Sequence, residues 1–368
     1  MSAGVYLHIP FCKSRCSYCD FATDVYRDND AVERYVEALC QEISAFPRSA
    51  IAADTIYFGG GTPSLLSPNQ AARIIDIVRL RFDVSGDAEI TMEMNPATVT
   101  GASLAGFRAL GVNRASFGVQ TFNERDLKLL ARGHDTDDAR ETFRLLREAG
   151  FDNISFDLIA GLPGQTIDDW KLNLDEAVAM DPEHLSLYLL EIHEGTPLAE
   201  QLRSGRRPMP DEELAAEMYE SMIDSLDAAG YTQYEISNFA KPGLESRHNT
   251  KYWRMDPVYG FGVSAHSFDG TQRYANDRDT ALYVEKMHRV GSAEVYREMI
   301  DRSSESVFLG LRLNSGIEIA AHREKFGVDL GNKVADLAEK GLLDIKDGRA
   351  RLTRRGMLFS NEVFAEFV

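Results

Sequence analysis

Short apolar runs alternate with longer stretches of helical period along the first half of the chain. The apolar runs have the length of strands, and the stretches between them place apolar residues at every third or fourth position. The predicted strands are Val5–Ile9, Thr55–Phe58, Glu89–Met94, Arg114–Val119, Ile154–Ile159 and His184–Leu189. The predicted helices lie at about 30–45, 67–81, 100–110, 135–149 and 166–180. Repeated strand-then-helix units predict parallel strands joined by right-handed crossovers.

This order of elements favours an α/β fold, namely a partial TIM-like barrel of six β/α units. The alternative is an open, doubly wound nucleotide-binding sheet. That fold would have a G-x-G-x-x-G turn after the first strand, and the turn is absent there. In barrels of this kind the functional groups gather at the C-terminal ends of the strands.

The pattern changes after residue 300. Three short helices are predicted at Ser306–Leu313, Glu318–Phe326 and Leu330–Lys340. A hairpin around Lys346-Asp347-Gly348 follows, with strands Gly341–Ile345 and Arg349–Thr353, and the last predicted element is a helix over Arg354–Phe367. Helices followed by a two-stranded wing are typical of a winged helix. We therefore divide the chain into a barrel domain over 1–240, a connecting and covering segment over 241–300, and a winged-helix-like α+β domain over 301–368.

The first predicted strand leads directly into a loop that contains three cysteines. Cys12, Cys16 and Cys19 have the spacing C-x3-C-x2-C. A four-iron cube offers one iron to each ligand, so three thiolates leave one iron open to a small molecule. Cys40 differs, because it lies in an apolar-periodic segment and is predicted to be a buried helix residue.

Three alternatives to an iron–sulfur site were weighed. A zinc site would borrow a fourth ligand such as His8, but zinc motifs usually contain a second pair of thiols, and none is present. A disulfide framework does not suit four cysteines in so long a chain. Three unrelated structural thiols would not explain why they share one loop directly after a strand.

Polar residues recur where successive predicted strands end. The loop Gly59–Pro63 follows the second strand, Glu93 ends the third, Gln120 follows the fourth, and Asp157 lies in the fifth, before Gly161–Gly164. Glycines in such a loop allow backbone groups to approach a ligand closely. Taken singly, a glycine-rich loop is often a tight turn, and a lone Glu or Gln is often a cap. Their repetition at one end of the sheet indicates a site.

Composition narrows the class of protein. The chain has 368 residues, an ordinary apolar fraction of 44% and a net charge of −18. The acidic balance and the absence of a basic recognition helix argue against nucleic acid as a partner. No apolar run approaches the roughly 18 residues of a membrane-spanning helix, and the chain begins without a leader. These features, with free thiols, predict a cytoplasmic protein.

The motifs resemble those of the radical SAM superfamily and, within it, the HemN-like group. The resemblance rests on Tyr6–Cys12, Tyr18–Phe21 and Phe58–Pro63, and it extends to Gly118–Gln120, Gly161–Gly164 and Gly262–Ala265. The group contains oxygen-independent coproporphyrinogen III dehydrogenases and HemW heme chaperones. In the superfamily the open iron of a [4Fe-4S] cluster binds S-adenosylmethionine (SAM), and one electron cleaves the SAM to a 5′-deoxyadenosyl radical.

The resemblance implies roles for individual residues. It implies that the cluster is bound by Cys12, Cys16 and Cys19, and that SAM is bound by Tyr6, Tyr18, Gly60, Gly61, Thr62, Glu93, Gln120, Arg132 and Asp157. Carboxylates can accept from the amino group or ribose of SAM, and an arginine can offset its carboxylate. In the dehydrogenases a second SAM shares this region, so Gln120, Arg132 and Asp157 are also candidates for a second site.

Two departures separate the chain from the dehydrogenases and fit the chaperones. Those enzymes have another cysteine two residues after the third, where this chain has Phe21. They also have an N-terminal extension of several dozen residues, whereas four residues precede Val5 here.

The stretch His248-Asn249-Thr250-Lys251-Tyr252-Trp253 spells H-N-x-x-Y-W, which is similar to a motif of the HemW chaperones. A neutral imidazole is a natural axial ligand of heme iron, so His248 is the first candidate ligand and His266 the second. A histidine beside two aromatic residues is also common as a structural residue.

The resemblance therefore implies a heme chaperone that binds heme, the cluster and SAM and transfers heme to acceptor hemoproteins, such as respiratory enzymes. The alternative is a radical SAM enzyme that acts on a tetrapyrrole, with coproporphyrinogen III as the first substrate to test.

Overall fold

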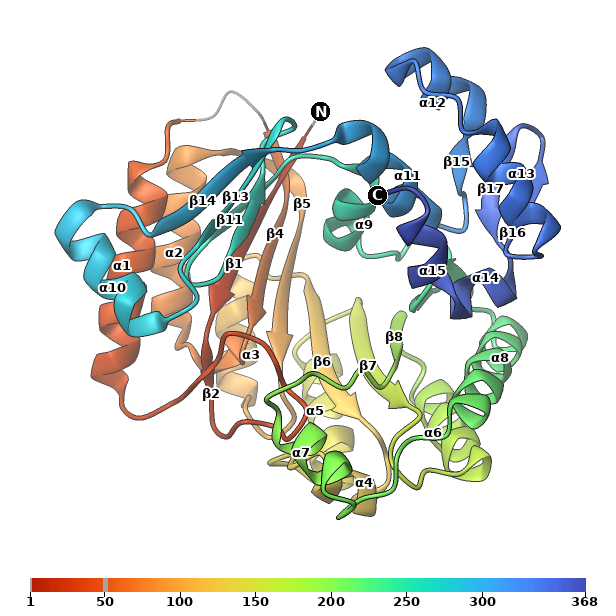
Figure 1. The fold of residues 1–368 in the computed structure, drawn as a ribbon. Helices are drawn as coiled ribbons and strands as arrows, with labels where there is room; N and C mark the ends of the chain where they lie inside the picture. The colour runs from red at the N-terminus through yellow and green to blue at the C-terminus, as the bar shows by residue number, and fades with distance from the viewer. Residues whose placement is uncertain (1, 49–51) are drawn as a thin grey trace.

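The computed structural model describes residues 2–48 and 52–368, and its centre is a large curved sheet (Figure 1). The sheet has twelve strands in the order β14-β13-β12-β11-β1-β4-β5-β6-β7-β8-β10-β9. Its central six are parallel, lie side by side in chain order, and are β1 Ala3–Ile9, β4 Ala52–Gly60, β5 Asp83–Met94, β6 Arg114–Gln120, β7 Ile154–Ala160 and β8 His184–Leu189. These six strands confirm the predicted parallel β/α order and the radical SAM-type α/β fold.

The crossover helices also lie where the helical period predicted them. They are α1 Asn29–Ala45, α2 Pro68–Arg81, α3 Gly101–Ala109, α5 Thr136–Glu148 and α6 Ile167–Met180. Reciprocal capping boxes fix the first residues of four of them, through Ser67, Thr100, Asp135 and Thr166. Three further α-helices among the described residues before 241 were not predicted, namely α4 Glu124–Leu129, α7 Pro197–Arg203 and α8 Glu212–Ala228, and neither were the two helices between 241 and 300.

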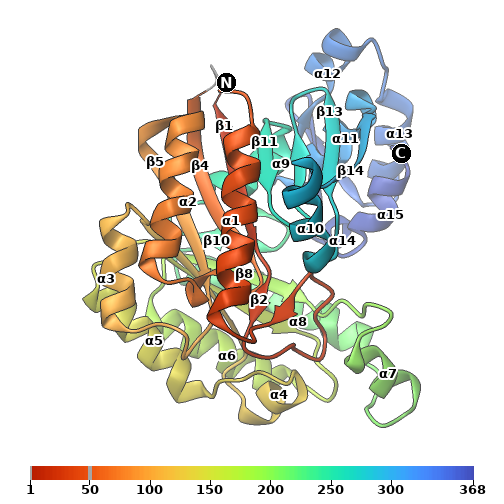
Figure 2. The same ribbon diagram turned by 90° about the vertical axis from the view of Figure 1, so that its left-hand side faces the viewer.

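The two faces of the central sheet differ in polarity. On β1, the residues Val5, Leu7 and Ile9 are buried in one large apolar core that includes residues of α1 and α2. In Figure 1, α1 and α2 lie on one side of β1 and β4 and α9 lies on the other, and Figure 2 shows α1 in front of the same strands. The alternate residues of β1, including Tyr6 and His8, therefore face the inner side, because side chains alternate along a strand.

The segment 241–300 adds to the sheet. After α9 Arg247–Arg254, the strand β11 pairs in parallel with β1, and three strands continue antiparallel beyond it. The elements are β11 Val258–Phe261, β12 His266–Phe268, β13 Gln272–Asn276, α10 Thr280–Val290 and β14 Glu294–Met299. On the opposite edge β8 pairs with the short strand β10 Asn238–Ala240, and β10 in turn pairs with β9 Thr232–Glu235. The segment 241–300, which the sequence analysis predicts to be a connecting and covering segment, thus supplies one edge of the central sheet.

The C-terminal elements have an apolar core of their own. Val307, Leu337, Leu343 and Val363 are buried in it. The elements are α11 Arg302–Arg312, β15 Ile317–Glu318, α12 Ile319–Phe326, α13 Gly331–Glu339, β16 Leu343–Lys346, β17 Arg349–Leu352, α14 Arg354–Leu358 and α15 Ser360–Ala365. The three helices and the hairpin agree with the prediction.

The prediction of one final helix over Arg354–Phe367 was wrong. The chain leaves helical geometry at Phe359, with φ −104° and ψ 31°, and α14 and α15 are separate. Met357 packs against both cores, whereas Val363 is buried only in the C-terminal one. In one straight helix these two positions would be about 240° apart, so the chain must turn between them.

Within the described ranges, the structure contains no helix that is both long and apolar enough to cross a bilayer.

Glu42 joins α1 to the edge of the sheet. Its carboxylate accepts from the Gly262 amide at 2.8 Å, the Asn276 side-chain amide at 2.6 Å and the Tyr283 hydroxyl at 2.6 Å. We expect Glu42→Ala to lower the free energy of unfolding by roughly 3 kcal/mol, because three donors lose their acceptor. Urea denaturation beside Glu37→Ala, an exposed position of α1, tests this. Equal midpoints for the two variants would contradict it.

Candidate functional site

The cysteine loop is held at both ends by the backbone. It follows β1 and lies between the short strands β2 Phe11–Cys12 and β3 Asp24–Val25, which pair with each other. In its middle, Ser17 donates its amide to the Leu130 carbonyl and its hydroxyl to the Leu129 carbonyl, both at 2.9 Å. Cys12, Cys16 and Cys19 are all free thiols.

The glycine loop touches the cysteine loop directly. The Gly61 amide donates to the Ile9 carbonyl at 2.8 Å. A Cβ at Gly61 would lie 2.8 Å from the carbonyl oxygens of Pro10 and Phe11, closer than any side chain can come. Gly60 has φ +110°, and a Cβ there would meet the His8 ring at 2.7 Å. The space that these two glycines leave is thus used by the neighbouring loop and by His8.

Polar side chains from the loops after β4 and α4 contact the thiols, and one from the loop after β5 links those two side chains. The Thr62 hydroxyl donates to Cys12 Sγ at 3.5 Å and accepts from the Asn95 amide at 2.7 Å. Arg132 reaches Cys16 Sγ at 3.4 Å and also donates to Asn95 Oδ1 and the Gly118 carbonyl, each at 2.7 Å. A guanidinium beside a sulfur favours the thiolate, which is the form that binds iron.

The donor set fits an iron–sulfur cluster better than a zinc ion. In the part of the chain that the structure describes, no group of three or more His, Cys, Asp or Glu side chains is arranged to hold a single metal ion. The zinc alternative required His8, but its Nδ1 is bonded to the Tyr6 hydroxyl and its Nε2 to the Ala22 carbonyl. A cube takes one thiolate at each of three separate irons. Burial raises the pKa of Cys12 to about 11, so iron must displace its proton.

Glu93 faces the inside of the sheet next to the glycine loop. One carboxylate oxygen accepts from the Tyr57 hydroxyl at 2.7 Å and the other from the Gly60 amide at 3.0 Å. Burial raises the pKa of Glu93 to about 7, and the nearby Asp157 adds to the rise. Burial likewise raises the pKa of Asp157. Two carboxylates in one low-dielectric space attract a cation.

The remaining SAM-site candidates lie around the same end of the sheet. Gln120 ends β6 with φ +68°, a strained conformation for this residue that is typical of functional sites. Tyr18 packs against the apolar cluster that includes Leu129 and Leu198. Tyr6 stacks on Tyr57 with ring centres 6.1 Å apart. The structure therefore gathers the thiols and the nine residues implied for SAM along the inner face and the C-terminal end of β1 to β7.

His248 lies toward the other end of the same inner face, where its ring stacks with that of Tyr6 at 6.3 Å. It is 1% exposed, with Nδ1 2.8 Å from the Thr55 hydroxyl and Nε2 3.2 Å from the Tyr252 hydroxyl. Thr55 precedes Gly60 by five residues on β4, about 16 Å along an extended strand. Tyr57 lies between the Thr55 end and the Gly60 end of β4, because its ring stacks on His248 at 5.0 Å and its hydroxyl bonds to Glu93.

The other residues of the H-N-x-x-Y-W stretch have different surroundings. The ring of Trp253 lies 4.2 Å from the Arg312 guanidinium, which joins α9 to α11. His266 lies on β12, where its Nδ1 is 3.2 Å from the Tyr296 hydroxyl on the exposed strand β14. His266 is therefore far along the sheet order from β4 to β7, where the SAM-site candidates lie.

Sequence reasoning missed Tyr57, Asn95 and Arg114, which all face the same inner side. The signal that could have found them is the alternation of polar residues along each strand: Tyr57 is two residues after Thr55, and Arg114 is two before Ser116. The predicted strands contain this pattern along their length, whereas the predicted site residues come from their C-terminal ends.

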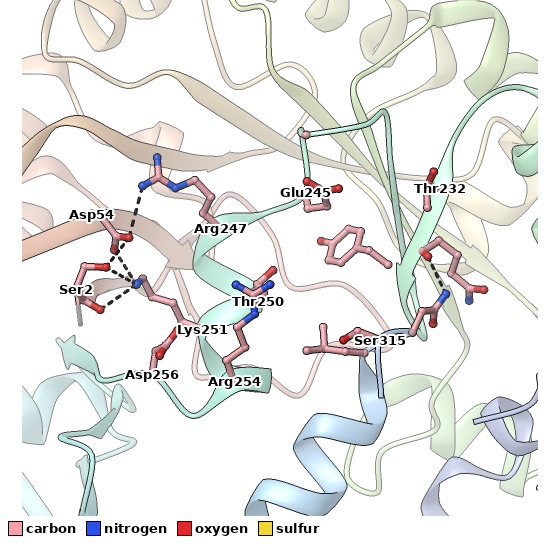
Figure 3. A pocket seen from close by; sticks show the side chains of 15 residues that line it. Ser2, Asp54, Thr232, Glu245, Arg247, Thr250, Lys251, Arg254, Asp256 and Ser315 are labelled. Atoms are coloured by element: carbon pink, nitrogen blue, oxygen red, sulfur yellow. Dashed lines mark hydrogen bonds and ion pairs between the residues drawn. The ribbon is translucent and has the colours of Figure 1, made fainter. Parts of the chain in front are cut away.

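A cavity of about 590 Å³ opens on a different face of α9 (Figure 3). Lys251 and Arg247 are among its lining residues, and their side chains turn toward Asp54, with which they form ion pairs at 2.7 and 3.5 Å (Figure 3). Asn314 and Ser315 of the C-terminal part line its far side. Its cations and carboxylates are nearly balanced, and the SAM-site candidates are not among its lining residues.

Family profiles match both parts of the chain: the Radical SAM superfamily over residues 6–177 and the HemN C-terminal domain over 299–359. "Heme chaperone HemW" of Bacillus subtilis is 38% identical to the chain, and the alignment covers 99% of each protein. The Lactococcus lactis protein of the same name is 34% identical over 99% of this chain and 97% of its own length. The chain belongs to the HemW family of radical SAM proteins.

A solved structure agrees with the radical SAM fold of this chain. The coproporphyrinogen III oxidase HemN from Escherichia coli, described as a radical SAM enzyme, matches with a TM-score of 0.87 and 26% identity. The match covers 100% of this chain and 90% of that one. Membership of the radical SAM superfamily implies a [4Fe-4S] cluster and SAM as cofactors.

The contact at Gly61 gives a prediction about the cluster. We expect Gly61→Ala to destabilise the protein by about 1–3 kcal/mol and to lower its iron content, because the new Cβ collides with the backbone of Pro10 and Phe11. Gly101→Ala is the matched control, since nothing lies within 4 Å of a Cβ there. Iron and sulfide per chain are measured after anaerobic reconstitution. Full cluster loading in Gly61→Ala would contradict this role.

Proposed function

We propose that this chain is a heme chaperone that binds a [4Fe-4S] cluster, SAM and heme and passes heme to acceptor hemoproteins, such as respiratory enzymes. The main support is the full-length similarity to proteins named heme chaperone HemW, together with a three-thiol loop held between Gly61 and Arg132. Free thiols that bind a reduced cluster need a reducing compartment, so the proposed location is the cytoplasm.

In this proposal Cys12, Cys16 and Cys19 bind the cluster, and the SAM site is formed by Tyr6, Tyr18, Gly60, Gly61, Thr62, Glu93, Gln120, Arg132 and Asp157. When bound, the two cofactors supply one-electron chemistry. The chain contributes position and charge. Glu93 and Asp157 offer carboxylates to a cationic ligand, and Arg132 offers a guanidinium beside the thiols.

Heme is assigned to the inner space near His248. Burial, and next the Lys251 charge, lowers the pKa of His248 to about 3, so the imidazole is neutral, as an iron ligand must be. Its Nε2 is bonded to the hydroxyl of Tyr252, which is 37% exposed. Binding of iron at Nε2 therefore requires that Tyr252 turn away.

A second candidate function is a radical SAM enzyme acting on a tetrapyrrole. The observation that favours it is the match to Escherichia coli HemN along the whole chain. This alternative predicts that SAM is cleaved and carbon dioxide is released in step with added coproporphyrinogen III under reducing conditions. Phe21 occupies the position at which the enzymes of that group have a further cysteine, which favours the chaperone.

The pKa of Glu93 gives a pH prediction for SAM binding. A carboxyl group with a pKa near 7 is ionised above pH 7 and neutral below it. Because SAM is cationic at its sulfonium and amino groups, we expect its affinity to fall about tenfold between pH 8 and pH 6. Anaerobic calorimetry on the cluster-loaded protein measures this. In Glu93→Gln the pH dependence of SAM affinity should disappear. An unchanged pH dependence in that variant would mean that another group is responsible for it.

Heme binding itself is tested by following the Soret band in an anaerobic titration of the cluster-loaded protein. We expect saturation near one heme per chain and a weakening of about tenfold or more in His248→Ala, because the iron loses its ligand. Tyr252→Phe keeps the ring but frees Nε2, so it should bind heme as tightly as the original protein or more tightly.

These two variants show whether His248 is a ligand of the heme iron or only a structural residue. If His248 were only structural, His248→Ala would bind heme unchanged, and Tyr252→Phe would affect stability alone. Non-saturating uptake by the original protein would reject the chaperone function and favour turnover of coproporphyrinogen III.

A further inference from the structure

Arg114 is a buried cation without a partner. It is 1% exposed and is among the largest fully buried side chains. Across the ranges 2–48 and 52–368, no side-chain hydrogen bond and no ion pair to its guanidinium is found, and its Nε is buried without an acceptor. The hydroxyl of Thr91, its register neighbour on β5, also lacks a partner. A buried charge normally costs several kcal/mol unless it is paired, so this arrangement indicates a missing anion.

The carboxylates near Arg114 are already used by other donors. Glu89 accepts from the amides of Arg247 and His248 at the start of α9. Both oxygens of Glu93 are bonded to Tyr57 and Gly60. Asp157 accepts from the Ser186 hydroxyl. The Arg114 charge opposes the rise in the pKa of Glu93 and of Asp157. Within the described ranges, however, no carboxylate oxygen forms a hydrogen bond or ion pair with its guanidinium, and its Nε still lacks an acceptor.

The polar groups around His184, whose pKa the Arg114 charge affects, are neutral and bonded to one another. His184 lies between the hydroxyls of Ser155 and Tyr234, each at 2.8 Å. Burial, and next the Arg114 charge, lowers the pKa of His184 well below its usual value. No second cation accompanies Arg114 among these residues, so the site would hold a single negative charge.

The site is distinct from the cluster end of the sheet. Arg114 starts β6 and Gln120 ends it, six residues and about 20 Å of extended strand apart. A SAM molecule whose carboxylate lies at the cluster therefore cannot also place that carboxylate on Arg114. The missing anion belongs to another ligand.

His248 is near enough to share that ligand. Its ring stacks on Tyr57, and Tyr57, Thr91 and Arg114 are register neighbours on three adjacent strands, about 10 Å from first to last. This part of the face reaches solvent beside α9, since Tyr252, whose hydroxyl is bonded to His248 Nε2, is 37% exposed. A large flat ligand can therefore approach this face.

We propose that Arg114 binds a propionate carboxylate of the heme whose iron is held at His248. This inference rests on the proposed function, and it adds the group that would orient the porphyrin. The guanidinium can donate two parallel hydrogen bonds to one carboxylate, which the Thr91 hydroxyl can supplement. The heme would then be bound at two points, its iron at α9 and its carboxylate at β6.

The test compares iron protoporphyrin IX with its dimethyl ester, both delivered in the same detergent micelles. We expect the original protein to bind the ester roughly 10- to 100-fold more weakly, because the ester cannot accept as a carboxylate does. Arg114→Gln should bind both compounds with the same, weaker affinity. The exposed Arg144→Gln is the matched control and should discriminate as the original protein does.

Two results would overturn the proposal: equal affinities of the original protein for acid and ester, or undiminished discrimination in Arg114→Gln. If Arg114→Gln fails to fold, Arg114→Lys replaces it, and discrimination should then be reduced because an ammonium does not form the paired bonds. If neither compound saturates the original protein, the proposed heme function fails. Saturable heme binding without discrimination rejects only the role of Arg114.

Discussion

The inner face of the central sheet is polar, and the need of every buried polar group for a partner determines how the rest of the molecule is arranged. A buried donor or acceptor without a partner costs about 1–3 kcal/mol. Thr55 is bonded to His248, Tyr57 to Glu93, and Ser155 to His184. These bonds fix α9 against one end of the strands and the glycine loop against the other. Among the described residues of this face, Arg114 and Thr91 are exceptions, and exceptions of this kind indicate where a ligand binds.

Two sites at opposite ends of the same face follow from this arrangement. At the C-terminal end, Gly61 allows the backbones of two loops to touch, so the three thiols are held beside Arg132. At the other end, α9 presents a neutral imidazole and a partly exposed tyrosine. Tyr57 contacts both ends through its hydroxyl and its ring. In the proposed function, the cluster and SAM lie toward one end of this inner face and heme toward the other, and the rings of Tyr6 and Tyr57 both stack with His248.

Much of this could be predicted from the sequence, because the fold depends on local patterns. The strand β8 was predicted with its exact bounds, and capping residues such as Thr166 mark helix starts that the pattern predicted closely. The break at Phe359 was missed because it depends on two cores that the last helices must contact. The cysteine spacing predicted a cluster loop, and the structure places the three thiols in one segment that the paired strands β2 and β3 hold. The unbonded guanidinium of Arg114 could not be predicted, because it depends on which hydrogen bonds the neighbouring side chains form between strands.

The central claim is that this chain binds heme and transfers it to an acceptor protein. The most direct measurement is the rate at which the heme-loaded protein transfers heme to the apo form of a heme b respiratory protein, followed by the Soret shift at several acceptor concentrations. Apomyoglobin in excess gives the rate of spontaneous heme loss. The account predicts transfer that is faster than this loss and accelerates with acceptor concentration, because donor and acceptor must meet. A rate equal to spontaneous loss at every acceptor concentration would contradict it.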